Sequence, residues 1–401
     1  ASWGPLPGRK ADAGLRAALA EQGIGLAAMT VEGDTASVAI ENRIWSAQAQ
    51  AFGRTARVMS GLLPPEVTTF RLRSLTRGMP MQEVTLTRQD LEALEYAPDG
   101  AWQAWVRAET VDATTRPDPR LNPEAAHALR LRPYAQPGLF DPDNPLRFDL
   151  GAELVGEWSP LPGLHLSGAI RQKLAGNLDQ ANRPSNSVLP HVRSDAALYY
   201  KTDDPQVEWL TAEYFLRPGR DLYGRLTFGL FERMYGGVSA ELLWAPVDRR
   251  LALGVELNHA MLRDTDGFGF QDYRVLTGHA SAYLDMGRGY HAQLDAGRYL
   301  AGDLGATLTL TRRYGNGIEV GAFATLTDVG FDDFGEGAFD KGITITLPLG
   351  AGQPTRATSS VTLRPLLRDG GARLSVRNRL YDLTLDDREA AAGKRWSRFW
   401  R

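Results

Sequence analysis

The residues best placed to do chemistry are charged side chains at alternate positions of polar-apolar repeats, such as the run Leu-Gly-Val-Glu-Leu-Asn at 253–258. Neighbouring side chains of a β-strand point to opposite faces, so such a repeat collects its charges on one face. Carboxylates and guanidinium groups that share a face can hydrogen-bond sugar hydroxyls, or they can brace one another as ion pairs. The candidates for this lining are Glu153, Glu213, Arg225, Glu241, Glu256, Asp295 and Glu319.

The charged face is acidic as a whole. Its further members are Asp149, Glu157, Arg147 and Arg171, so acids outnumber bases. Such a lining disfavours anions, and a route along it suits a neutral or cationic glycan better than a polyanion. Two interpretations stay open: a bracing network that carries nothing, which is the more ordinary one, or a lining that faces a ligand. If the interior is open, changing Glu241 and Glu256 to Gln should alter ion selectivity.

Two expected loops hold a second group of candidates. In the segment 183–195 they are Asn186, His191, Arg193 and Asp195, which could grip sugar hydroxyls. In the segment 334–342 they are Phe334 and Glu336, which could stack on and bind a sugar ring. The structural alternative is that prolines make the first loop rigid and that glycines set turn geometry in the second.

Other chemistries find little support. The chain has no cysteine, and its six histidines include no His-x-x-x-His pair, so neither a metal nor a cofactor is expected. His279 and Ser281 share a strand face, but no orienting partner for a hydrolase triad is evident. Pairs of Asp and Glu could be interpreted as glycosidase acids, but barrels rich in Glu are common, so these pairs do not indicate a glycosidase. We therefore predict a protein without enzymatic activity.

The elements that must position these residues are strands. The expected strands are 147–158, 162–174, 206–216, 221–234, 237–245, 250–262, 270–285, 289–300, 303–314, 318–327, 339–347, 358–366 and 372–385, with a first one at 127–135. Their connections tend to alternate between short and long, as in bacterial barrels with tight periplasmic turns. The sequence predicts a mainly β protein: a transmembrane antiparallel β-barrel of about 12–14 strands.

The apolar face of these strands would contact lipid. Its members include Leu150, Leu154, Leu166, Ile170, Leu226, Phe228, Leu242, Trp244, Leu253, Val255, Leu257, Leu308, Leu310, Ile343 and Ile345. The 42 glycines and the 36 aromatic residues (Trp 9, Tyr 13, Phe 14) suit turns and aromatic girdles. A net charge of −3 gives no indication of nucleic-acid binding.

A small α+β domain precedes the barrel. Residues 1–97 read as α-β-β-α-β-β followed by a short helix at 88–95, and resemble periplasmic modules that dock partners. Residues 98–126 are expected to be a linker with one strand at 102–111, residues 127–385 the barrel, and residues 386–401 a C-terminal tail. No signal peptide is visible, so we expect a mature chain or a piece of a longer one.

Several segments resemble the YjbH/GfcD-type outer-membrane proteins of exopolysaccharide and capsule machinery. They include Gly-Leu-Phe-Asp-Pro-Asp-Asn-Pro-Leu at 138–146, the loop 183–195, Arg-Tyr-Leu-Ala-Gly-Asp at 298–303, and the pair Phe-Gly-Glu-Gly at 334–337 and Phe-Asp-Lys-Gly at 339–342. The resemblance runs over nearly the whole chain. It implies a part in exporting or assembling a secreted polysaccharide, without a known enzymatic activity, and often alongside a further upstream barrel.

We therefore expect a bacterial outer-membrane barrel with its N-terminal module in the periplasm. Its expected partners are a polysaccharide, outer-membrane lipid and periplasmic export components, which include an upstream barrel or other subunits. The alternatives are a plugged scaffold that anchors the periplasmic module, an outer-membrane hydrolase, and a soluble glycan-binding protein.

Overall fold

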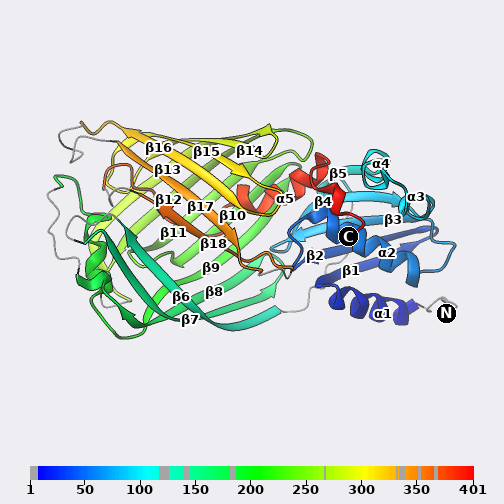
Figure 1. The fold of residues 1–401 in the computed structure, drawn as a ribbon, viewed down its shortest axis with the longest axis horizontal. Coiled ribbons are helices and arrows are strands. Elements are labelled where there is room, and N and C mark those ends of the chain that lie inside the picture. The colour runs from blue at the N-terminus through cyan, green and yellow to red at the C-terminus, as the bar shows by residue number, and fades with distance from the viewer. Residues whose placement is uncertain are drawn as a thin grey trace.

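A computed structural model describes residues 8–116, 126–139, 144–180, 187–265, 268–330, 333, 339–350, 354–364 and 369–401. A small α+β module lies at one end of a long β-barrel, and the C-terminal segment reaches from the barrel to the module (Figure 1). The barrel end that touches the module is called the near rim below, and the opposite end the far rim.

The module is a five-stranded sheet in the order β1-β2-β3-β4-β5, with β2 and β3 parallel. Helix α2 packs on it through Phe52, Ala56 and Met59, whose spacing of three to four residues gives one buried face. Its elements are α1 Gly8–Glu21, β1 Ile24–Glu32, β2 Thr35–Asn42, α2 Gln48–Leu62, β3 Thr69–Thr76, β4 Met79–Thr87, α3 Arg88–Leu94, α4 Gly100–Arg107 and β5 Glu109–Asp112. The predicted helices and strands of residues 1–97 are thus confirmed.

Among the described residues, the barrel is a sheet of 13 antiparallel strands in which each strand pairs with its neighbours in sequence. This confirms the predicted antiparallel β-barrel and its strand count. The strands are β6 Ala126–Leu139, β7 Leu146–Leu161, β8 Leu164–Gly176, β9 Gln206–Gly219, β10 Leu222–Leu230, β11 Tyr235–Trp244, β12 Leu251–Arg263, β13 Phe270–Gly287, β14 Tyr290–Arg298, β15 Leu304–Arg313, β16 Glu319–Thr327, β17 Asp340–Pro348 and β18 Thr358–Leu363.

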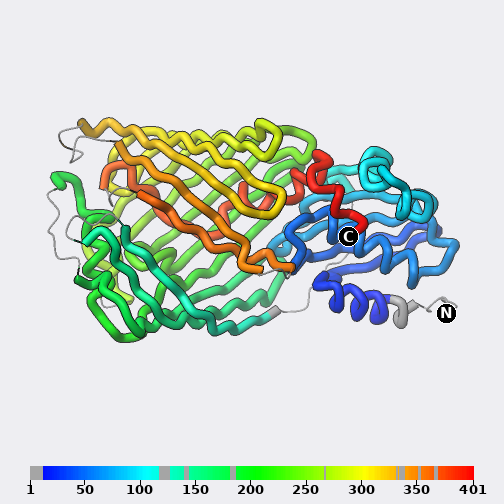
Figure 2. The backbone as a smooth tube through the Cα atoms, in the orientation of Figure 1, coloured from blue at the N-terminus to red at the C-terminus, as the bar shows by residue number. Residues whose placement is uncertain are grey.

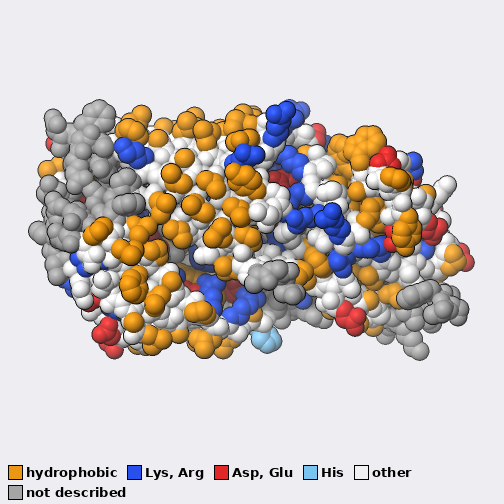
Figure 3. Space-filling model, in the orientation of Figure 1, with side chains coloured by type: hydrophobic (Ala, Val, Ile, Leu, Met, Phe, Trp, Pro, Cys, Tyr) orange, Lys and Arg blue, Asp and Glu red, His pale blue; other side chains and the backbone are white. Residues whose placement is uncertain are grey.

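The two faces of the barrel wall differ as the alternation predicts. On β10, Leu226 is 51% exposed on the outside, whereas its neighbour Arg225 is 1% exposed inside. On β12, Val255 and Glu256 show the same contrast, at 51% and 3%. Every apolar residue predicted for the outer face is exposed or half-buried there. On the face drawn in Figure 3, hydrophobic side chains are spread over the outside of the barrel.

Two sequence predictions are wrong. The first part of the linker predicted at 98–126 is instead structured, because α4 and β5 belong to the module and α4 replaces the first part of the strand predicted at 102–111. The strand predicted at 372–385 is absent: residues 374–378 have no regular structure, and helix α5 spans Leu380–Ala391. Among the described residues, no helix is long and apolar enough to cross a membrane.

The C-terminal segment instead runs through the barrel. Residues 369–379, which we call the lumen strap, pass along the interior from the far rim toward the near rim (Figure 2). Helix α5 then lies between the near rim and the module, and residues 396–401 pack against α2 through Trp396 and Phe399. Barrel and module are therefore joined by the end of the chain as well as by the segment before β6.

Candidate functional site

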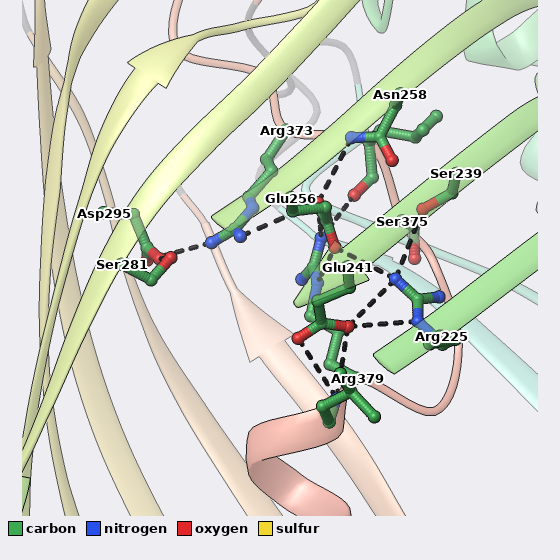
Figure 4. Close-up of polar contacts among 12 residues, drawn as sticks. Arg225, Ser239, Glu241, Glu256, Asn258, Ser281, Asp295, Arg373, Ser375 and Arg379 are labelled. Carbon is green, nitrogen blue, oxygen red and sulfur yellow. Dashed lines mark hydrogen bonds and ion pairs between the residues drawn. The ribbon is translucent and has the colours of Figure 1, made fainter. Parts of the chain in front are cut away.

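The lumen strap is held by charge pairs with the barrel wall (Figure 4). The guanidinium of Arg379 lies 3.0 Å from a carboxylate oxygen of Glu256 on β12. Arg373, six residues earlier in the strap, lies 2.9 Å from Asp295 on β14 and 3.8 Å from Glu256. Both carboxylates are at most 3% exposed. If the strap left, Asp295 would lose the arginine that pairs with it, and Glu256 would keep only Arg225 of the wall.

Arg225 on β10 is the centre of this network. Its side chain is fully buried and lies 3.0 Å from Glu241 and 3.3 Å from Glu256. It also donates a hydrogen bond to the backbone carbonyl of Arg377 in the strap, at 3.1 Å. Glu241 in turn accepts a hydrogen bond from the backbone N–H of Leu380, at 3.1 Å. The predicted lining residues of β10, β11 and β12 thus form one site that grips the strap.

The strap also has an apolar side. Leu374 and Val376 are 2% and 7% exposed and pack into a cluster with Phe231 and Tyr235 of the wall. Nearer the module, the side-chain amide of Asn378 donates a 2.7 Å hydrogen bond to Glu213. The alternating apolar and polar residues that predicted a wall strand therefore contact two surfaces inside the barrel, one apolar and one charged.

Far-rim loop residues fix the start of the strap. The backbone N–H of Arg193 donates to Asp369 at 2.7 Å, and the Arg193 guanidinium donates to the carbonyl of Arg373 at 2.9 Å. The same guanidinium pairs with Glu232 at 2.8 Å. His191 and Asp195 contact each other at 3.3 Å. Arg193 is thus a residue that holds the strap, whereas Asn186, Phe334 and Glu336 lie outside the described residues.

Two predicted lining residues lie away from the strap. Glu153 on β7 is 1% exposed and pairs with Arg171 at 2.7 Å and Arg132 at 2.5 Å. Glu319 begins β16 at the near rim and pairs with Arg313 at 2.9 Å. Arg313 also binds Asp386 of α5, at 2.9 Å, so Glu319 belongs to the attachment of α5.

Comparison with known proteins adds a family to this geometry. Residues 6–386 match the family described as "Exopolysaccharide biosynthesis protein YbjH". This chain belongs to that family. The "Uncharacterized lipoprotein YjbH" of Escherichia coli (strain K12) is 31% identical over 372 residues, which are 88% of this chain and 53% of the relative. This chain therefore spans about half the length of that relative. The resemblance noted from the sequence motifs is confirmed.

The hydrolase arrangement considered for this YjbH-family chain is not assembled. The Ser281 hydroxyl donates to Asp295 at 2.5 Å, while His279 packs edge-on against Tyr299, with ring centroids 4.7 Å apart. Neither ring nitrogen of His279 has a hydrogen-bond partner among the described residues. Those residues also hold no group of three or more His, Asp or Glu side chains that could bind a metal ion.

The sequence prediction missed the residues that the strap contributes, Arg373, Asn378 and Arg379. The available signal was charge balance. The predicted lining held more acids than bases, and an enclosed acidic face needs cations opposite it. The segment 373–379 carries arginines at 373, 377 and 379, which lie on one side of an extended chain and can supply this positive charge.

Proposed function

We propose that this chain is a non-enzymatic outer-membrane β-barrel that takes part in exporting or assembling a secreted exopolysaccharide. In this proposal the module lies in the periplasm and docks other export components. The observation that carries it is the two-faced wall in a YjbH-family chain: exposed Leu, Val and Phe outside and buried charges inside. An apolar outer surface around a polar interior is the arrangement of barrels that cross a membrane.

The strap gives the export proposal a definite form. It occupies the lumen beside the acidic lining, so glycan would pass only where the strap is displaced or leaves space beside it. Arg225, Glu241 and Glu256 would then exchange contacts with the strap for hydrogen bonds to sugar hydroxyls. The loop residue Arg193 would hold the far-rim end of the strap in place or release it.

A second candidate function is a plugged scaffold that anchors the periplasmic module and conducts nothing. The specific observation in its favour is the double attachment of the strap, by charge pairs and by the apolar contacts of Leu374 and Val376. Both candidates share the barrel and the membrane, and they differ in whether the strap moves.

Conductance in planar bilayers separates them. The protein would first be shown to fold in detergent by heat-modifiable mobility on a gel. Steady conductance that the cognate polysaccharide blocks is expected for the export function. A folded barrel that inserts and never conducts, with or without glycan, would overturn the export path and favour the scaffold.

A cross-link tests whether the strap must move. The chain has no cysteine, so Glu213→Cys with Asn378→Cys introduces the only two thiols. These side chains meet at 2.7 Å, within reach of a short bifunctional thiol reagent. The bridged protein should lose conductance and should fail to support polysaccharide secretion in cells. Each single variant treated with the same reagent is the control, and full activity of the bridged protein would contradict strap movement.

A further inference from the structure

The near rim carries exposed arginines on the outer side of the barrel. Arg250 precedes β12, Arg288 forms the turn between β13 and β14, and Arg312 lies near the end of β15. Among the described residues, none of these three guanidinium groups pairs with a carboxylate. Figure 3 shows Lys and Arg side chains gathered where the barrel meets the module. This part of the rim is therefore cationic and uncompensated.

Arg312 is held in place by aromatic rings. Its guanidinium carbon lies 4.9 Å from the ring centroid of Tyr290 and 4.7 Å from that of Tyr314. The next residue, Arg313, points to the other face and is fully engaged with Glu319, Asp386 and α5. The two adjacent arginines thus differ. Arg313 points inward and attaches α5 to the barrel, whereas Arg312 points outward and keeps its hydrogen-bond donors available.

The arginines border the apolar outer surface. Leu251, Leu284 and Leu310 are 40%, 44% and 48% exposed, and they lie one, four and two residues from Arg250, Arg288 and Arg312 in the sequence. Tyr290, at 41% exposed, lies at the boundary between the two. Tyrosine beside arginine at the edge of an apolar band is typical of the membrane-water interface.

The far rim has a different charge pattern. Arg274 and Arg298 are exposed there, but so are the acids Asp204, Asp272 and Asp328. Near the module, the loop before β12 holds one exposed acid, Asp248, against Arg249 and Arg250. The excess of positive charge is thus confined to the rim that faces the module.

We propose that Arg250, Arg288 and Arg312 bind the phosphate headgroups of anionic phospholipids in the periplasm-facing leaflet. The inference rests on the proposed outer-membrane placement and adds a lipid partner to it. A guanidinium offers planar, paired donors that match phosphate oxygens, and the apolar band below would contact the acyl chains of the same lipid. A soluble anion would use the arginines but leave the apolar band without a role.

The test compares one triple variant and one double variant in lipid vesicles. Arg250→Gln, Arg288→Gln and Arg312→Gln are combined in one protein, and Arg274→Gln with Arg298→Gln at the far rim is the matched control. Tryptophan fluorescence, including that of Trp244 at the near rim, is quenched with brominated phosphatidylglycerol or with brominated phosphatidylcholine. The ratio of the two quenching efficiencies reports preference for the anionic lipid.

The wild-type protein and the far-rim control should prefer phosphatidylglycerol. The near-rim variant should lose that preference, by roughly fivefold for each charge removed and less at high salt. Equal quenching by both lipids in the wild-type protein, or an unchanged preference in the near-rim variant, would overturn the inference and leave the membrane placement intact. Failure of the folded wild-type protein to enter either vesicle would instead contradict the outer-membrane proposal itself.

Discussion

Single residues show how closely the end of the chain fits the module. A Cβ atom built on Gly53 of α2 would lie 1.8 Å from the backbone carbonyl oxygen of Phe399, whereas one on Gly61 of the same helix meets nothing within 4 Å. The carbonyl belongs to backbone that is fixed by the packing of Trp396 and Phe399. Glycine at 53 is thus a requirement of this contact.

Gly53→Ala should detach the C-terminal residues from the module. The alanine methyl group cannot fit beside the Phe399 carbonyl, so residues 396–401 must move away and lose their buried aromatic contacts. Amide exchange of that segment should accelerate, as measured by mass spectrometry. Gly61→Ala is the matched control and should stabilise the helix by about 0.5–1 kcal/mol, because alanine is the better helix former. Unchanged exchange in Gly53→Ala would contradict the contact.

Asp387 of α5 should make the attachment of α5 sensitive to pH. Burial raises the pKa of its carboxyl to about 6, although hydrogen bonds from Ser74 and Gln82 of the module oppose the shift. The folded state therefore holds this proton more tightly than the unfolded chain does. The resulting stability is fully present below the unfolded pKa, near 4, and is lost as the pH rises through about 6.

Asp387→Asn should remove that dependence. The amide oxygen can still accept from Ser74 and Gln82, and no charge is buried at neutral pH. At pH 7.5 the variant should melt at a higher temperature than the wild type, with a free energy of unfolding larger by at most about 3 kcal/mol. Near pH 4 the stabilities of the two proteins should converge. Thermal unfolding at both pH values measures this, and parallel pH profiles would rule the explanation out.

At the scale of elements, the strap is a strand-like sequence that is used without a sheet. Leu374 and Val376 alternate with arginines as in a membrane strand, and this pattern produced the wrong prediction of a wall strand at 372–385. The lumen satisfies both faces of the segment because an apolar cluster lies on one side and buried carboxylates on the other. Periodicity reports that a segment has two faces, and it does not report which surfaces they meet.

The arginines of the strap should contribute unequally to its attachment. Arg379→Gln leaves Glu256 with weaker compensation and should cost about 3 kcal/mol. Arg377→Gln makes the same change in charge, but the Arg377 guanidinium stacks on Trp209, 4.0 Å from the ring centroid, so about 1 kcal/mol is expected. Amide exchange of residues 369–379 should rise much more in the first variant. Similar increases in both would show that the ion pair with Glu256 is not the main attachment.

For the whole molecule, the number of strands leaves two edges. With 13 antiparallel strands, β6 and β18 run in the same direction, and no pairing joins them among the described residues. In a barrel with an even number of strands, a strand running from the far rim to the near rim would fill this seam. Here the strap runs in that direction, but it lies inside the lumen. Figure 1 shows β18 and β6 as the strands that border the seam.

Strand β18 should therefore be the least protected part of the wall. It is exposed along nearly its whole length, and in the part of the chain that the structure describes it pairs only with β17. Its amides should exchange much faster in detergent than those of β12, which pairs on both sides. Hydrogen-exchange mass spectrometry compares the two peptides directly. Equal protection would mean that another strand covers the edge of β18.

The sequence by itself determined the barrel, most strand positions, the facing of the wall and the α+β module. These features follow from local period and turn chemistry, which act between residues close in the chain. The pairing of Glu256 with Arg379 and the buried path of the strap were decided by tertiary structure alone. Residues 123 positions apart meet only after the wall has closed around the segment. Whether an alternating segment joins the wall or fills the lumen depends on which surface satisfies both of its faces, and that surface exists only in the folded barrel.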